Sequence, residues 1–289
     1  MIRLAVRARI ARAGIARIQG AYADAERGYQ RAIAQVRRAF GARDPYLGSL
    51  YNNLGVLRKA QGRYAEAVTF YKRAAKRVSA RDRESQATLA HNLGGIEHAR
   101  GRYAAAEPHA RRSVRLRRSL HGDGHPAVAA DVAALAAIVE GRGRLAEAAE
   151  LYRRALAVFQ RKLGARSLEV GLNLASLAAV EQRRGRLAAA RALYRRALAI
   201  KEPLLGLDHP DVAMTVNNLA VLEREAGDLA RARALFRRAQ LSFRRRLGDR
   251  HPHTVLATQN LHAASVTKRN KPSRSSTRKA LKKHAATRR

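Results

Sequence analysis

Histidine close to aspartate is the combination in this chain that could support chemistry, because the two side chains together can bind a metal ion or move a proton. It occurs at Asp208 with His209 and at Asp123 with His125, and His251 lies in a third turn of similar composition. All three histidines directly precede a proline, which is typical of the first residues of a helix. We therefore interpret them as turn residues and expect no metal site.

Other signatures of catalysis are missing from the sequence. His91 and His98 are seven positions apart, which is about 10 Å along a helix, so they cannot share one metal ion. The chain has no cysteine, which excludes disulfides, thiolate nucleophiles and cysteine zinc sites. It contains no phosphate-binding glycine loop, His-Glu-x-x-His motif or nucleophile elbow. The sequence predicts that the protein is not an enzyme and has no catalytic residues and no cofactor.

The net charge and the apolar runs restrict the partners of the protein. Lysine and arginine number 59 against 22 acidic residues, and the resulting net charge of +37 attracts acidic partners. The longest apolar run, Val132 to Val139, is far below the roughly 20 residues that cross a membrane. Residues 1–23 include five arginines and no acid, which we interpret as a degenerate first helix rather than a targeting segment. We expect a cytoplasmic protein without a membrane span.

The elements that position the side chains follow from an internal repeat. One glycine recurs with a period of about 42 residues, which is three shorter between the second and third copies. An alanine stands five positions after each glycine, and nine positions after it comes an aromatic residue in five of six cases, the exception being Ala110. The glycines are Gly20, Gly62, Gly101, Gly143, Gly185 and Gly227.

Each repeat is predicted to be an antiparallel helical hairpin. The glycine ends one helix where the backbone needs a positive φ, and the next helix opens with apolar residues at helical spacing. The alanine lets the two helix axes approach closely, and the aromatic residue four positions later lies on the same face. A turn with glycine before proline, as from Gly206 to Pro210, recurs between hairpins.

Together these residues resemble tetratricopeptide repeats, specifically the 42-residue variety of the kinesin light chain type. The segments Asn217–Ala220, Gly227–Ala232, Phe236–Ala239 and Leu247–Pro252 look like one complete unit of that family, and the resemblance covers roughly residues 11 to 267. It implies an all-α, right-handed superhelical solenoid of about six hairpins over residues 1–267, including a capping helix at about Thr254 to Thr267. It also implies a non-catalytic scaffold or adaptor that binds another protein or an extended peptide, and the positive charge favours an acidic partner.

Three departures from the pattern predict local irregularity. The link between Arg77 and Ala87 is three residues short and lacks the glycine and proline, and Ala110 replaces the aromatic residue. We expect looser or differently angled packing around the third hairpin, and a local hinge. Pro203 lies late in its predicted helix and is expected to shorten or kink it.

The resemblance implies that the first helix of each hairpin lines a concave groove. Asparagine offers both a donor and an acceptor, so asparagines along the groove could hydrogen-bond a peptide backbone, while the alanines between them leave room for an apolar side chain. The alternative is that the asparagines are a family habit and the alanines only pack helices together. The predicted groove residues are Asn52, Asn53, His91, Asn92, Ala134, Ala137, Ser176, Asn217, Asn218 and Asn260.

Basic residues suggest a second hypothesis, the binding of nucleic acid or another polyanion. Residues 268–289 contain five lysines and five arginines without an acid, and their serine, threonine and proline content predicts a disordered tail. A solvated surface whose arginine stems cover apolar atoms is the simpler interpretation. The sequence does not determine the oligomeric state. The candidate polyanion-binding residues are Arg153, Arg154, Arg195, Arg196, Arg237, Arg238, Lys279, Lys282 and Lys283.

Overall fold

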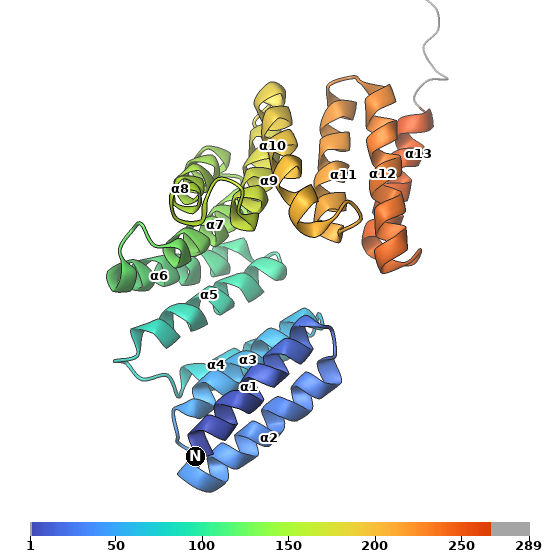
Figure 1. The fold of residues 1–289 in the computed structure, drawn as a ribbon. Coiled ribbons are helices and arrows are strands. Elements are labelled where there is room, and N and C mark those ends of the chain that lie inside the picture. Colours follow the sequence, from blue (N-terminus) through green and yellow to red (C-terminus); the bar gives the residue numbers. More distant parts are fainter. Residues whose placement is uncertain (1, 267–289) are drawn as a thin grey trace, which may run out of the picture. The chain divides into compact units, whose positions relative to one another are not determined.

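The computed structural model describes residues 2–266, which form thirteen helices and no strand (Figure 1). The chain divides into two compact units, Met1–Ile200 and Lys201–Arg289, and the division falls inside one helix. We call them unit 1 and unit 2, and the single array predicted over residues 1–267 stays a prediction. The predicted tail at residues 268–289, including Lys279, Lys282 and Lys283, lies outside the described residues.

Unit 1 consists of consecutive antiparallel helical hairpins. The all-α repeat fold predicted from the sequence is therefore confirmed. Its helices are α1 (Ile2–Ile18), α2 (Tyr22–Phe40), α3 (Tyr46–Ala60), α4 (Tyr64–Ala75), α5 (Arg83–Ala99), α6 (Tyr103–His121), α7 (Pro126–Gly141), α8 (Leu145–Leu163), α9 (Leu168–Arg183) and the first part of α10 (Leu187–Leu205).

The recurring glycine has the conformation that the sequence required. All six copies have a positive φ, such as the 79° of Gly143. Side chains of L-residues disfavour this region of the backbone map. The backbone N–H of Gly143 donates to the carbonyl of Glu140 and ends α7. The chain then reverses, and α8 begins at Leu145.

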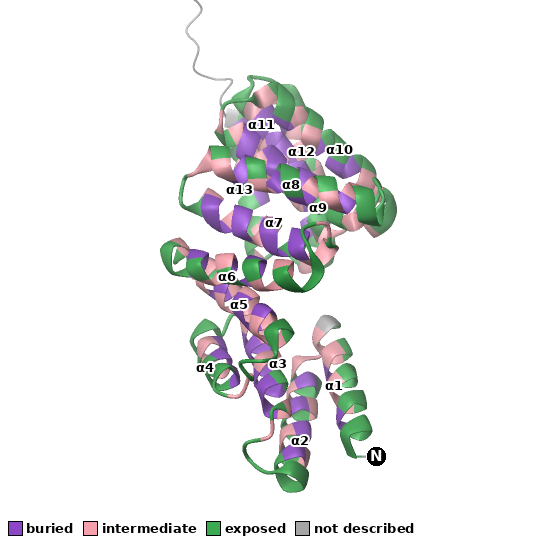
Figure 2. Cartoon of the chain, turned by 90° about the vertical axis from the view of Figure 1, so that its left-hand side faces the viewer, coloured by how far each residue is buried: buried purple, intermediate pink, exposed green. Residues whose placement is uncertain are grey.

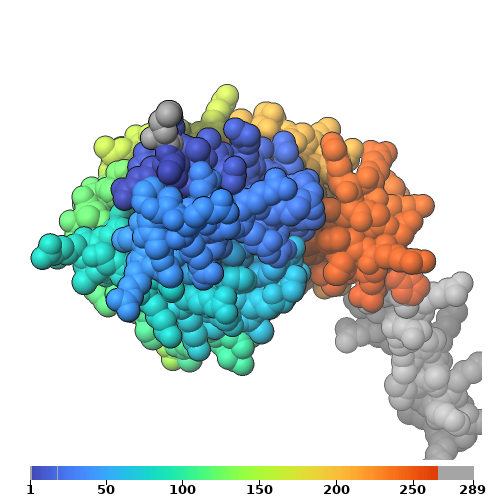
Figure 3. Space-filling view, turned by 90° about the horizontal axis from the view of Figure 1, so that it is seen from below, coloured from blue at the N-terminus to red at the C-terminus, as the bar shows by residue number. Residues whose placement is uncertain are grey.

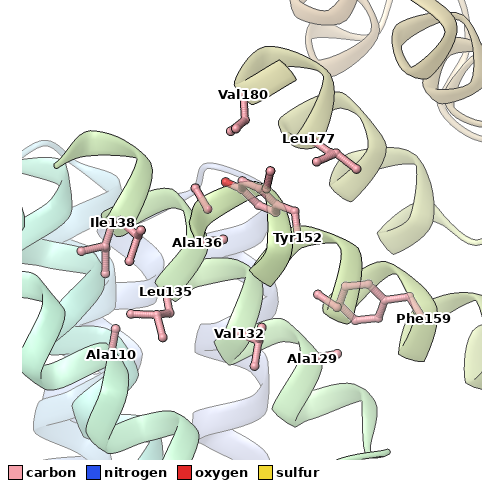
Figure 4. Close-up of a cluster of buried hydrophobic side chains, with 14 of the residues drawn as sticks. Ala110, Ala129, Val132, Leu135, Ala136, Ile138, Tyr152, Phe159, Leu177 and Val180 are labelled. Atoms are coloured by element: carbon pink, nitrogen blue, oxygen red, sulfur yellow. The ribbon is translucent and has the colours of Figure 1, made fainter. Parts of the chain in front are cut away.

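Alanine and aromatic side chains fill the core between the helices. The alanine five positions after each glycine is fully buried in all six repeats, and each aromatic residue at the ninth position is at most 4% exposed. Figure 4 shows Tyr152 and Phe159 of α8 beside Leu135 of α7 and Leu177 of α9, which belong to the same buried cluster. This cluster runs from α6 to α10, and a second cluster of buried residues runs from α1 to α5.

The third hairpin, α5 with α6, differs from the prediction in an informative way. A Cβ atom on Gly94 would lie 3.2 Å from the backbone nitrogen of Ala110, so the small residues bring the two backbones together. Packing within this hairpin is therefore close rather than loose. The irregularity lies before it, because α4 has 12 residues where α2, α6 and α8 have 19. Turns over residues 76–82 take the place of the missing helix.

The first helices of the hairpins form an inner layer in unit 1. Each of them contacts the next, α1 with α3, α3 with α5, α5 with α7 and α7 with α9. Within the described part of the unit, the second helices α2, α4, α6 and α8 make no such contacts with one another. Figure 2 shows many buried residues on α7, which has neighbours on both sides, and few on the terminal helix α1.

The remainder of α10 belongs to unit 2, together with α11 (Pro210–Glu225), α12 (Leu229–Leu247) and α13 (Pro252–Val266). Pro203 does not shorten α10, which has the same 19 residues as α12. Phe236 and Ala232 of α12 pack with Ala220 of α11 and Ala264 of α13. The predicted final helix is present, beginning two residues earlier than expected.

Candidate peptide-binding groove

The three histidines of the turns cap helices, as the sequence predicted. The Nδ1 atom of His125 accepts a hydrogen bond from the backbone N–H of Ala127 at 3.1 Å, and that of His209 accepts one from Asp211 at 3.2 Å. His251 caps α13 in the same way. The described residues contain no cluster of side chains that could hold a metal ion. These histidines thus have a structural role.

Two of the predicted asparagines bind each other along the inner layer of unit 1. The Nδ2 atom of Asn92 on α5 donates to Oδ1 of Asn52 on α3 at 2.8 Å. Each side chain is half-buried, and each retains a donor or an acceptor for a ligand. These asparagines therefore join neighbouring helices, a structural role that neither alternative from the sequence included, and their binding of a peptide stays a prediction.

A cavity of about 220 Å³ lies between α3 and α5. We call it the α3–α5 cavity. Its walls include Asn52 and Asn53 of α3 and Ser85 and Thr88 of α5, with Val78 from the irregular link. Most of these side chains can donate or accept a hydrogen bond. The predicted residues Asn52 and Asn53 thus lie at an opening in the inner layer.

A second cavity of about 200 Å³ lies between α5 and α7, and we call it the α5–α7 cavity. The predicted groove residues His91, Ala134 and Ala137 line it, so the structure brings these three together. Its remaining walls were not predicted from the sequence: they are Lys59, Gly95, His98, Ala110, Ser113, Asp131 and Ile138. The small alanine walls expected in the middle of the groove do leave a space.

Asp131 organises one wall of the α5–α7 cavity. Its Oδ1 atom is 2.7 Å from Nδ1 of His91, and its Oδ2 atom accepts hydrogen bonds from Ser113 at 2.6 Å and from Arg117 at 2.8 Å. Burial raises the pKa of Asp131, but the hydrogen bonds from His91, Ser113 and Arg117 outweigh burial and lower it. The carboxylate is therefore ionised, and both of its oxygens have hydrogen-bond partners.

The arrangement of serine, histidine and aspartate here does not suit nucleophilic catalysis. Ser113 is 1% exposed and donates to Asp131, not to His91. An activated serine needs its hydroxyl on the histidine, with the carboxylate on the opposite side of the ring. The network therefore holds α5, α6 and α7 together.

Lys59 and His98 line the same cavity. A Cβ atom on Gly95 would lie 3.0 Å from the Nζ atom of Lys59, so the ammonium group rests on the α5 backbone where there is no side chain. Burial lowers the pKa of Lys59, and burial with the nearby charge of Lys59 lowers the pKa of His98. The ring of His98 packs edge-on against Tyr103, with centroids 5.4 Å apart.

Other predicted groove residues do not lie in these cavities. Ser176 donates a hydrogen bond to the carbonyl of Leu172 on its own helix at 3.3 Å. In unit 2, Asn217 is 5% exposed and accepts a hydrogen bond from Asn260 at 3.3 Å, while Asn218 is half-buried. Asn217 and Asn260 therefore repeat the pairing of Asn52 and Asn92 within their own unit.

The predicted basic stripe is partly neutralised by acidic neighbours. Arg153 pairs with Glu181 and lies 3.8 Å from Glu150, and Arg238 pairs with Glu202 at 2.6 Å. The remaining members, Arg154, Arg195, Arg196 and Arg237, are exposed. Figure 3 views the surface from another side, where the exposed residues of α1 and α2 appear in blue.

The sequence profile of the tetratricopeptide repeat family matches residues 5–79, 85–161 and 168–240. The chain therefore belongs to this family. The first match is separated from the second by residues 80–84, which lie within the irregular link between α4 and α5. Among curated proteins, no sequence matches the chain significantly.

Solved structures of several repeat proteins are similar to this chain. BtubC (BKLC) from P. vanneervenii is 23% identical with a TM-score of 0.61, covering 86% of this chain and 94% of that one. Kinesin light chain TPR-like repeats from Podosopora anserina are 22% identical with a TM-score of 0.53, covering 62% and 86%. NprR in complex with its cognate peptide NprX is 12% identical with a TM-score of 0.66, covering 98% and 78%. At these identities the likeness shows the fold alone.

No helix among residues 2–266 is long and apolar enough to span a membrane.

Proposed function

We propose that the protein is a non-catalytic scaffold that binds an extended peptide segment of another protein, and that the inner layer of unit 1 is the binding surface. The observation that carries the proposal is the pair of cavities on either side of α5. Each is smaller than the roughly 300–1,000 Å³ of typical small-molecule sites. Cavities of this size suit single side chains of a peptide that runs across successive helices.

The polar groups between the cavities supply the second requirement for binding a peptide. A peptide backbone presents a donor and an acceptor at each residue, and Asn52 and Asn92 retain capacity for both. The complex of NprR with the peptide NprX gives one example of a peptide bound by a protein of similar fold. The high positive charge of this chain favours an acidic peptide.

A library of random peptides of about 12 residues, which span about 40 Å when extended, tests the proposal. Peptides enriched on the full chain should lose affinity roughly tenfold on Asn53→Ala combined with Thr88→Val, because two hydrogen-bonding groups of the α3–α5 cavity are removed. Gln30→Ala on α2 is the control, since Gln30 is exposed outside the groove. Peptides that bind the double variant and wild type equally would exclude this groove.

Binding of a polyanion by the basic stripe and the tail stays a prediction, as does the cytoplasmic location. Neutralisation of Arg153 and Arg238 by acidic neighbours weakens the stripe as an anion site. Binding of nucleic acid through charge alone would fall steeply between about 50 and 200 mM salt. The peptide affinity should change far less over this range.

A further inference from the structure

The α5–α7 cavity contains a cation that the fold itself does not neutralise. Lys59 has no hydrogen-bond or ion-pair partner among residues 2–266. The carboxylate of Asp131 lines the same cavity, but it is paired with His91, Ser113 and Arg117. A partly buried ammonium group without an acceptor is unfavourable, because burial removes water that nothing in the protein replaces.

The other groups of the cavity are an accepting nitrogen and small apolar side chains. Nδ1 of His91 is held by the ionised carboxylate of Asp131, so this nitrogen carries its proton and Nε2 is left to accept a hydrogen bond, for example from a peptide N–H. The remaining walls, from Ala134, Ala137 and Ile138, are apolar and small. They limit the space to one short side chain and reduce the competition of water with an ion pair.

We infer that the α5–α7 cavity is the subsite for an acidic side chain of the bound peptide, with Lys59 as the residue that pairs with its carboxylate. The inference rests on the proposed function and adds the chemical identity of one anchoring residue. A side chain is favoured over the chain end, because the inner layer continues past the cavity towards α3 on one side and α9 on the other. A peptide that follows these helices passes the cavity.

Lys59→Met separates binding from stability. The variant keeps the aliphatic length and removes a charge that lacks a partner, so the midpoint of thermal unfolding should be equal to or higher than that of wild type. Lys72→Met on the exposed face of α4 is the matched control. Gly95→Ala is a second variant, since its methyl group would crowd the Nζ atom of Lys59 while favouring the helix.

The probe is the same random peptide library, selected separately on the full-length wild type, on Lys59→Met and on Lys72→Met. Wild type and Lys72→Met should enrich aspartate or glutamate at one fixed position, and Lys59→Met should lose that preference alone. In the selected peptide, glutamate to glutamine at that position should weaken binding roughly tenfold on wild type and leave binding to Lys59→Met unchanged. Amidation of the peptide terminus should have no effect.

Any other result would exclude either the acidic subsite or the peptide-binding function. If Lys59→Met selects the same acidic position, or if amidation abolishes binding, Lys59 does not pair with an acidic side chain. If groove-dependent peptides are enriched without any acidic preference, the peptide-binding function stands and the acidic subsite does not exist. If no peptide is enriched, both the function and the subsite are wrong.

Discussion

The α5–α7 junction and the α7–α9 junction of unit 1 use equivalent positions of the repeat in opposite ways. Asp131 of α7 and Asn173 of α9 both lie twelve residues before their recurring glycine, and both are buried. Asp131 has three hydrogen-bonding partners, whereas both amide atoms of Asn173 lack a partner among the described residues. In α3 and α5 the equivalent residues are Leu50 and Leu89.

The partner position shows the same contrast. Arg117 stands sixteen residues after its glycine and pairs with Asp131, while the equivalent residue of the next repeat is Phe159. Glu107, six residues after its glycine, is replaced by Ala149 in the next repeat. One junction therefore holds a polar network beside a cavity, and the other is apolar apart from the buried amide of Asn173. Repeats that share one backbone conformation can thus differ in the side chains that meet at individual junctions.

The largest effect is expected from Asp131→Ala. The substitution leaves His91, Ser113 and Arg117 without their shared acceptor, so the free energy of unfolding should fall by roughly 3 kcal/mol. Urea unfolding followed by circular dichroism measures the change. Asp131→Asn, which keeps the shape and part of the hydrogen bonding, should cost less. A loss below about 0.5 kcal/mol would mean that the network contributes nothing to the junction.

Glu107→Gln should have the next largest effect. Burial raises the pKa of Glu107, but hydrogen bonds from Arg144, Arg142 and Arg111 outweigh burial and lower it to about 2. The ionised carboxylate therefore stabilises the folded state at pH values above 4.5, the ordinary pKa of a glutamate. This contribution is lost as the pH falls from 4.5 towards about 2. We expect a loss of roughly 2 kcal/mol at neutral pH.

The pH dependence distinguishes this pairing from general repulsion. The difference between Glu107→Gln and wild type should shrink between pH 4.5 and about 2, as measured by unfolding at several pH values. Glu150→Gln is the control, because Glu150 is 65% exposed and lies 3.8 Å from Arg153. Such an exposed pair contributes little to stability. A difference that persists unchanged at low pH would show that the charge of Glu107 is not involved.

Asn173→Leu should make the α7–α9 junction uniformly apolar and raise the free energy of unfolding by about 1 kcal/mol. Its buried amide lacks partners among residues 2–266, and the equivalent position holds leucine in two other repeats. Asn173→Ala tests whether any gain comes from removing the amide or from filling space. Destabilisation by both variants would indicate that the amide is bonded in solution.

The smallest effect concerns the irregular link before α5. Amides in the first turn of α5 should exchange hydrogen several-fold faster than those in the first turn of α9, a difference below about 1 kcal/mol. The shortened α4 and the turns at residues 76–82 support α5 less than the full-length α8 supports α9. Equal exchange in the two helices, measured by mass spectrometry, would exclude the predicted hinge.

The sequence predicted the fold well because the residues that begin, end and pack its helices act locally. A glycine with positive φ, an alanine at a helix contact and a histidine before proline each act within a few residues, and Gly143, Ala148 and His125 have the expected roles. Ala134 and Ala137 line a cavity, because alanine leaves space on a helix face that has a neighbour, while their role in binding a peptide stays a prediction.

The candidate site was predicted only in part, because it depends on distances between helices. Lys59 and Asp131 come from different hairpins, and nothing in the period shows that they face one cavity. A signal did exist for Asp131, which is the single acid within residues 126–139 of α7, a stretch that is otherwise apolar. The pairing of Asn52 with Asn92 could not be foreseen without knowing how closely α3 and α5 approach.

The shortened α4 also bears on how such an array can grow. Repeat arrays gain or lose whole hairpins when a segment of one period is duplicated or deleted, since each new copy then meets a neighbour of the same shape. The hairpins after Gly101 follow one another at a constant period and are interchangeable in this sense. The hairpin of α3 and α4 is three residues short of that period, so a copy placed elsewhere would meet a neighbour shaped for a longer helix. The order of the hairpins around α5 is therefore fixed, whereas the number of hairpins after α5 can change by duplication or deletion of one period.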